Sequence, residues 1–183
     1  AKEAAQRGLS NTPNTPEALD AYVSDKGKEL LVDHGVFTEK ELSAHHEVML
    51  ENYIIKMEIE ARTLEDLCYN YVLPAAVNYQ TALAQNVNEL KSAGLGEPAY
   101  KYQLETLRVL SAHINGLHAQ SEKMNQLIEK IDRESSTREK ARILCDEVKP
   151  VMEQIREHAD KLELYVDDHT WPLVKYRELM FLK

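Results

Sequence analysis

The feature that most constrains the fold of this chain is a run of apolar residues that repeat every three or four positions. Its members are Leu107, Leu110, Ile114, Leu117, Ser121, Met124, Ile128 and Ile131, with Ser121 as the polar exception. An α-helix places such positions on one face, and a sustained 3-4 repeat is typical of helices that pack along a coiled-coil seam. The pattern predicts one long helix from about Pro98 to Asp132.

A second run with similar spacing follows the short connector at 133–137. Its members are Leu144, Val148, Val151, Ile155, His158 or Ala159, Leu162 and Tyr165. A short connector between two such helices favours an antiparallel return of the chain. Residues 97–169 are therefore predicted to form an antiparallel, coiled-coil-like helical hairpin, with a kink at Pro150.

A third long helix is predicted before the hairpin. Thr38 and Glu41 have the spacing of a capping box, and apolar positions then recur at helical spacing on both sides of Pro74. Proline removes one backbone hydrogen bond, so we expect a kink near Pro74 while the helix continues. Further upstream, Thr15 as cap and Pro16 as first helical residue predict a shorter helix.

These patterns together predict an all-α, elongated helical bundle. Helix-favouring residues dominate the sequence, which has only 6 Gly and 6 Pro. We expect a single helical domain over 1–183: an N-terminal segment with short helices (1–37), a long helix kinked near Pro74 (38–93), the hairpin (97–169) and an aromatic C-terminal tail (170–183).

Charge and hydropathy exclude two classes of partner. The formal net charge of -9 repels nucleic-acid phosphates, so no nucleic-acid partner is expected. The chain has no apolar run near the about 20 residues that a membrane helix needs, so no membrane partner is expected. Cys68 and Cys145 lie far apart in sequence and are typical of reduced thiols, which predicts a cytoplasmic protein.

No motif in the chain predicts chemistry. The Gly94–Gly96 pair lacks the remaining residues of a phosphate-binding loop. His46 and Glu47 begin a zinc-protease motif, but Leu50 occupies the place of the second histidine. A carboxylate-bridged metal site in a bundle needs Glu-x-x-His, which does not occur in this sequence. We therefore predict no catalytic, cofactor-binding or metal-binding residue.

Two regions are candidates for an interface instead. Glu58, Glu60 and Arg62 interrupt the apolar stripe of the long helix, which indicates either a solvated face or a polar surface covered by another domain. Trp171 and Tyr176 belong to an aromatic tail of the kind that docks on its own bundle or on a partner.

Five segments of the chain resemble one known family. They are Asn14–Asp20, Glu47–Tyr53, Met57–Arg62, Leu73–Gln80 and Trp171–Phe181. The chain resembles the C-terminal region of type III glutamine synthetases, the large bacterial form of that enzyme. Val174 departs from the family pattern, where a second proline is expected. The chain also opens at Ala1 inside a charged, helix-like run, which suggests a piece of a larger protein.

The resemblance implies what the parent protein does. The family joins ammonia to glutamate at the expense of ATP, with Mg²⁺ or Mn²⁺ held in a catalytic domain that this chain lacks. It implies the catalytic domain of the same chain and a homo-oligomer as partners. This chain is then expected to be structural and inactive alone. The alternative is a free-standing helical adaptor that binds a partner through its hairpin.

Overall fold

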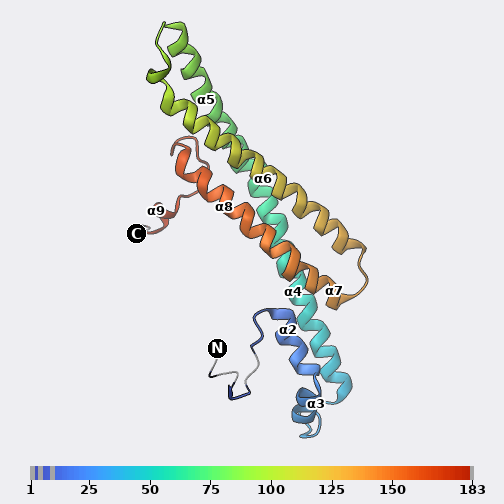
Figure 1. Ribbon diagram of the computed structural model, residues 1–183. Coiled ribbons are helices and arrows are strands. Elements are labelled where there is room, and N and C mark those ends of the chain that lie inside the picture. The colour runs from blue at the N-terminus through green and yellow to red at the C-terminus, as the bar shows by residue number, and fades with distance from the viewer. Residues whose placement is uncertain (1–2, 4–5, 9–10, 182–183) are drawn as a thin grey trace. The chain divides into compact units, whose positions relative to one another are not determined.

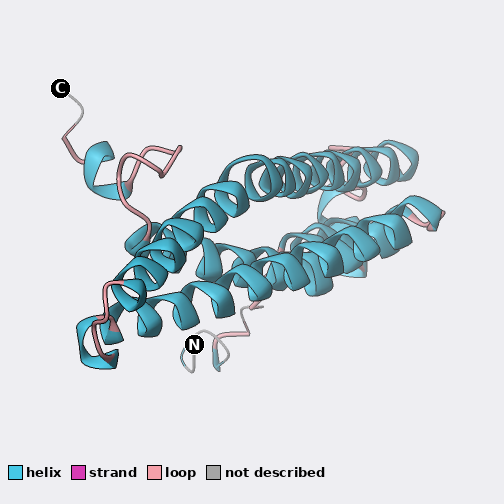
Figure 2. Ribbon diagram, turned by 90° about the horizontal axis from the view of Figure 1, so that it is seen from above, coloured by secondary structure: helices cyan, strands magenta, loops and turns pink. Residues whose placement is uncertain are grey.

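The computed structural model describes residues 3, 6–8 and 11–181 (Figure 1). All regular elements among these residues are helices, as the colours of Figure 2 show. The predicted all-α class is confirmed. The side chains of Tyr176 and Arg177 lie outside the described part of the structure.

Residues 11–38 contain three short helices: α2 (Thr15–Asp20), η1 (Ala21–Val23) and α3 (Asp25–Leu31). The prediction that Thr15 caps this helix is wrong, because the N-cap is the preceding residue. Asn14 Oδ1 accepts the hydrogen bond from the Glu17 N–H at 2.9 Å. Asn14 has the extended backbone that an N-cap needs, whereas Thr15 is already helical. Pro16 accordingly occupies the second helical position and is buried.

The predicted long helix consists of α4 (Glu39–Leu67), η2 (Cys68–Val72) and α5 (Leu73–Ser92), which follow one another without a break. Its capping box is confirmed. The Glu41 N–H donates to Thr38 Oγ1 at 3.2 Å, and the Thr38 N–H donates to Glu41 Oε2 at 2.8 Å. Two backbone donors that the helix itself cannot satisfy are thus paired.

A π-helical turn precedes each of the two internal helix prolines. In η2 the Leu73 N–H bonds to the Cys68 carbonyl, five residues back, immediately before Pro74. In a regular helix the Pro74 ring would clash with the carbonyl of the residue four positions earlier, and the wider turn relieves this clash. The kink predicted near Pro74 therefore has a defined cause, which is the π turn together with the proline.

Pro150 repeats the arrangement. The turn η4 (Leu144–Val148) ends with the Lys149 N–H bonded to the Leu144 carbonyl, again five residues back. Both prolines are exposed, so neither ring fills the core.

Replacing Pro74 with alanine is expected to stabilise the chain by about 1 kcal/mol. The substitution removes the need for the π turn and restores a backbone donor, whereas the exposed ring contributes little packing. Part of the gain is lost because alanine frees the unfolded chain. Chemical denaturation measures the change, and a destabilised variant would show that the π turn, rather than a regular helix, is what the packing requires.

The remaining elements are η3 (Glu97–Ala99), α6 (Lys101–Arg133), α7 (Thr137–Ile143), η4, α8 (Lys149–Tyr165) and α9 (Tyr176–Leu179). In α6, Leu110, Leu117, Met124 and Ile131 are at most 1% exposed, and they lie seven residues apart. The predicted coiled-coil-like seam is confirmed at these positions. The chain reverses after Arg133, which makes the predicted hairpin.

The second arm of the hairpin needs one correction. Leu144, Val148, Val151, Ile155 and Leu162 are buried as predicted. Tyr165 is 37% exposed, however, and Val166 takes its place at 2% exposure. A four-residue step from Leu162 keeps an apolar side chain on the packed face, and the tyrosine remains in contact with water.

The chain divides into two compact units. Unit 1 comprises residues 1–60 and 127–150, and unit 2 comprises residues 61–126 and 151–183. The expectation that 1–183 forms a single domain stays a prediction.

Candidate functional site

The predicted interface residues of α4 are accessible to solvent. Glu60 and Arg62 are exposed, and Glu58 is half-buried. In the described part of the chain none of the three forms an ion pair. Their role at an interface stays a prediction.

An exposed apolar stripe on α4 escaped the sequence analysis. Val48, Ile55 and Ile59 are 52%, 54% and 59% exposed. Steps of seven and four residues place all three on one face of a helix. The buried residues of α4 lie on another face, among them Leu50, Ile54 and Ala61. The 7-4 spacing is present in the sequence, but the buried apolar residues of α4 form a longer helical pattern that dominates it.

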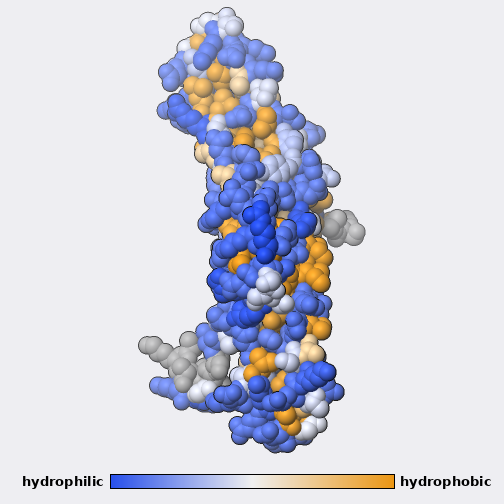
Figure 3. All heavy atoms as spheres, turned by 90° about the vertical axis from the view of Figure 1, so that its right-hand side faces the viewer, coloured by the Kyte–Doolittle hydropathy of each residue, from blue (hydrophilic) through white to orange (hydrophobic). Residues whose placement is uncertain are grey.

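Figure 3 shows one face of the molecule, on which apolar side chains reach the surface in separate areas among hydrophilic ones.

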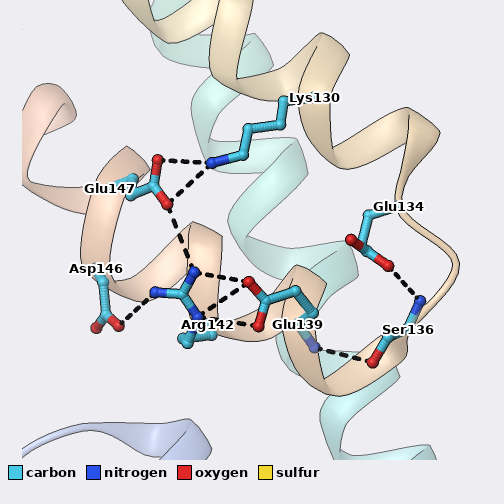
Figure 4. Close-up of polar contacts among 7 residues, drawn as sticks. All are labelled: Lys130, Glu134, Ser136, Glu139, Arg142, Asp146 and Glu147. Carbon is cyan, nitrogen blue, oxygen red and sulfur yellow. Dashed lines mark hydrogen bonds and ion pairs between the residues drawn. The ribbon is translucent and has the colours of Figure 1, made fainter.

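The most connected polar cluster of unit 1 lies around Arg142 (Figure 4). Its guanidinium contacts Glu139 at 2.6 Å, Asp146 at 3.6 Å and Glu147 at 3.7 Å. Lys130 Nζ approaches Glu147 to 3.0 Å and so joins the end of α6 to η4. The hydrogen bonds from Arg142 hold the pKa of Glu139 below its usual range. The cluster pairs both cations with carboxylates, so it serves as a cross-link between helices.

The connector beside this cluster is closed by its own side chains. Glu134 Oε1 accepts from the backbone N–H groups of Ser135 and Ser136 at 2.8 and 2.9 Å. Ser136 Oγ then accepts from the Glu139 N–H at 3.3 Å and caps α7. The Ser136 hydroxyl thus satisfies one of the free backbone donors at the start of α7.

A second polar cluster of unit 1 is centred on Asp20. Its carboxylate accepts from Arg138 Nε at 3.0 and 2.7 Å and approaches Arg138 Nη2 to 2.6 Å. His46 Nε2 lies 3.2 Å from Asp20 Oδ1. A cavity of about 380 Å³ beside the cluster is lined by His46, Arg138 and the hydroxyls of the connector. The Asp20 carboxylate thus links α2 to α7 through Arg138 and to α4 through His46.

Unit 2 is cross-linked by hydrogen bonds along α6. Asn125 Nδ2 donates to Glu65 Oε1 at 2.7 Å, and Tyr69 Oη donates to Glu122 at 3.0 Å. Burial, with a smaller contribution from Glu122, raises the pKa of Tyr69 to about 12, so its hydroxyl stays protonated as a donor. These bonds fix the register of α6 against the long helix.

The two cysteines are free thiols in packed surroundings. Cys68 is fully buried, and burial raises its pKa to about 11. Cys145 is half-buried near Tyr53, whose pKa is raised by burial and then by Cys145. A thiol nucleophile needs a lowered pKa and a partner base, so the geometry of Cys68 supports packing.

The C-terminal tail is anchored by Lys175, a residue that the sequence analysis missed. Its ammonium donates to the carbonyls of Val166 at 2.8 Å and Glu163 at 3.0 Å, and it lies 2.8 Å from Asp168 Oδ1. A cation among the last carbonyls of α8 is favoured by the helix dipole. No motif distinguishes Lys175 from other lysines, because the contact forms only when the chain turns back after α8.

Trp171 is 7% exposed in this anchored tail. Its Nε1 has no hydrogen-bond partner among the described residues. The interface role predicted for Trp171 stays a prediction, and that of Tyr176 falls on a side chain outside the described residues.

Two kinds of site are absent from the described residues. Within the described residues no group of three or more His, Cys, Asp and Glu side chains is arranged to hold a metal ion. No described helix combines the length and the apolar character needed to cross a membrane.

The described contacts define a helical domain whose polar clusters are cross-links between helices. Residues 1–91 match the family described as "Glutamine synthetase C-terminal domain". The chain belongs to this family, as its resemblance predicted.

Full-length relatives extend the match over the whole chain. A glutamine synthetase from Bacteroides fragilis (strain YCH46) is 36% identical over 186 residues, which cover 100% of this chain and 25% of that protein. A type-3 glutamine synthetase from Dictyostelium discoideum is 32% identical over 185 residues, which cover 98% of this chain and 25% of that protein. A glutamine synthetase from Butyrivibrio fibrisolvens is 26% identical over 180 residues, 98% of this chain and 26% of that protein. The chain thus spans about a quarter of the length of these relatives.

Proposed function

We propose that this chain is the structural C-terminal domain of a glutamine synthetase and supports the catalytic domain or the contacts between subunits. The parent enzyme joins ammonia to glutamate with ATP and Mg²⁺ or Mn²⁺, which bind in the catalytic domain. The enzyme is a cytoplasmic homo-oligomer in this proposal. The family match and the relatives' names support the assignment to glutamine synthetase.

One observation carries the structural role. Val48, Ile55 and Ile59 form an apolar stripe on a face of α4 that no other described residue covers to any large extent. Large apolar side chains that share a face and remain more than half exposed indicate a surface for another domain or subunit. The polar clusters described above already serve as cross-links within the chain and supply no reacting group.

The test places two charges on this stripe in a glutamine synthetase that contains this chain as its C-terminal region. The Ile55→Glu, Ile59→Glu double variant is expected to lower glutamine formation at least about tenfold, or to dissociate the oligomer, because burying two unpaired carboxylates is unfavourable. Sedimentation and a glutamine assay measure the two effects. The isolated 183-residue chain with the same changes is expected to keep its melting midpoint, since both side chains are exposed.

Leu30→Glu is the matched control, because Leu30 is 62% exposed and lies outside the stripe, in α3. Unchanged activity and assembly in the double variant would exclude the proposed role of the stripe. That result would favour the adaptor alternative.

A further inference from the structure

Two imidazole rings face each other inside unit 2. His113 lies on α6 and His158 on α8, and their Nδ1 atoms are 3.0 Å apart. The ring centroids are separated by 5.3 Å, with 61° between the ring planes. A hydrogen bond between two nitrogens requires a proton on one and a lone pair on the other, so the contact needs at least one ring to be neutral.

Gly116 leaves the space in which the His158 ring packs against α6. A Cβ atom at position 116 would lie 2.4 Å from Cε1 and 2.5 Å from Nε2 of His158, far closer than real contacts allow. The ring therefore lies directly on the backbone of α6, at a separation that only glycine permits. This contact accounts for a glycine in the interior of a helix, where it costs up to about 1 kcal/mol relative to alanine.

The number of protons on the pair decides whether the contact survives. Two neutral rings share one hydrogen bond. One added proton gives an imidazolium that donates to a neutral imidazole, which preserves the contact. A second proton removes the last acceptor and places two like charges 3.0 Å apart.

Burial and the charge of Lys161 also oppose the second proton. Burial lowers the pKa of His113, and the charges of His158 and Lys161 lower it further. A cavity of about 490 Å³ connects the pair to solvent, and its other described lining residues are Glu157, Asp160 and Lys161, all on α8. Asp160 is engaged by Arg156 at 3.6 Å. Apart from His113 itself, no described charged group from α5 or α6 lines this cavity.

We propose that the His113–His158 pair is a proton-dependent contact between α6 and α8, which forms with at most one added proton and is broken by the second. Unfolded histidines bind protons near pH 6.5, whereas the folded pair takes its second proton at a lower pH. The unfolded state therefore binds more protons below about pH 6.5. The contribution of the pair to the free energy of unfolding is fully present above that pH. It falls as the solution becomes more acidic.

The test compares thermal melts of the 183-residue chain at pH 7.5 and pH 5.0, with EDTA in all buffers. His113→Asn keeps a polar group near the Nδ1 position but cannot titrate. The wild type is expected to lose about 4 °C more between the two pH values than H113N does. His118→Asn is the matched control, because His118 is exposed on the same helix, and it should behave as the wild type. Equal pH dependence of H113N and the wild type would overturn the proposal.

A second measurement does not depend on the folding of a variant. Ring-nitrogen NMR of the ¹⁵N-histidine-labelled wild type follows the two rings through the titration. We expect two separate steps, the second well below pH 6.5. Independent titration of both rings in one step near pH 6.5 would also overturn the proposal.

Discussion

Truncating Leu117 to alanine is expected to lower the free energy of unfolding of unit 2 by about 3 kcal/mol. Leu117 is fully buried in the seam of α6, where Leu110 and Met124 flank it one heptad away. The substitution loses the transfer free energy of the removed carbons and leaves a cavity that a packed helix interface closes only in part. Guanidinium denaturation followed by Trp171 fluorescence measures the change, because the only tryptophan lies in the same unit.

The matched control is Leu164→Ala. This leucine is on α8 in the same unit but is 76% exposed, so its truncation should change stability by less than about 0.5 kcal/mol. Equal effects of the two substitutions would mean that the seam of α6 does not form the core of unit 2.

Replacing Lys175 with methionine is expected to release the C-terminal tail at a local cost of about 2 kcal/mol. Methionine keeps most of the apolar stem but removes the ammonium, which leaves the carbonyl of Val166 and the carboxylate of Asp168 without this donor. Trp171 lies between these contacts in sequence and is buried in the wild type. Its fluorescence should shift to longer wavelength as the tail leaves the end of α8 and the indole reaches water.

Lys101→Met controls for loss of charge. Lys101 is 71% exposed and lies 3.9 Å from Glu105, so its ion pair contributes little. Hydrogen exchange of the amides at 166–175 should accelerate in K175M and remain unchanged in K101M. Wild-type protection and an unshifted Trp171 spectrum in K175M would show that the tail is held by apolar packing alone.

Much of the helical architecture followed from local patterns. The seven-residue repeat from Leu110 to Ile131 specifies a helix with one buried face, and the capping box at Thr38 defines where the long helix begins. Errors arose where two neighbouring residues could serve equally. Asn14 and Thr15 are both good caps, and Tyr165 and Val166 both follow Leu162 at helical spacing. The extended backbone of Asn14 makes it the cap, and packing buries Val166 instead of Tyr165.

The candidate surfaces were less predictable. Glu58, Glu60 and Arg62 stand out in the sequence because charges interrupt an apolar stripe. The exposed face formed by Val48, Ile55 and Ile59 carries no such signal, because an isoleucine looks the same in sequence whether or not its helix face is covered.

The sequence by itself determined that this chain is helical, that its longest helix bends near Pro74, and which family it resembles. These properties depend on side-chain spacing and proline chemistry within a few turns of one helix. Only the tertiary structure decided that His113 meets His158 over Gly116 and that Lys175 binds the end of α8. Those contacts join residues 45 and 9 positions apart, and they exist because packed helices bring together groups that no local pattern connects.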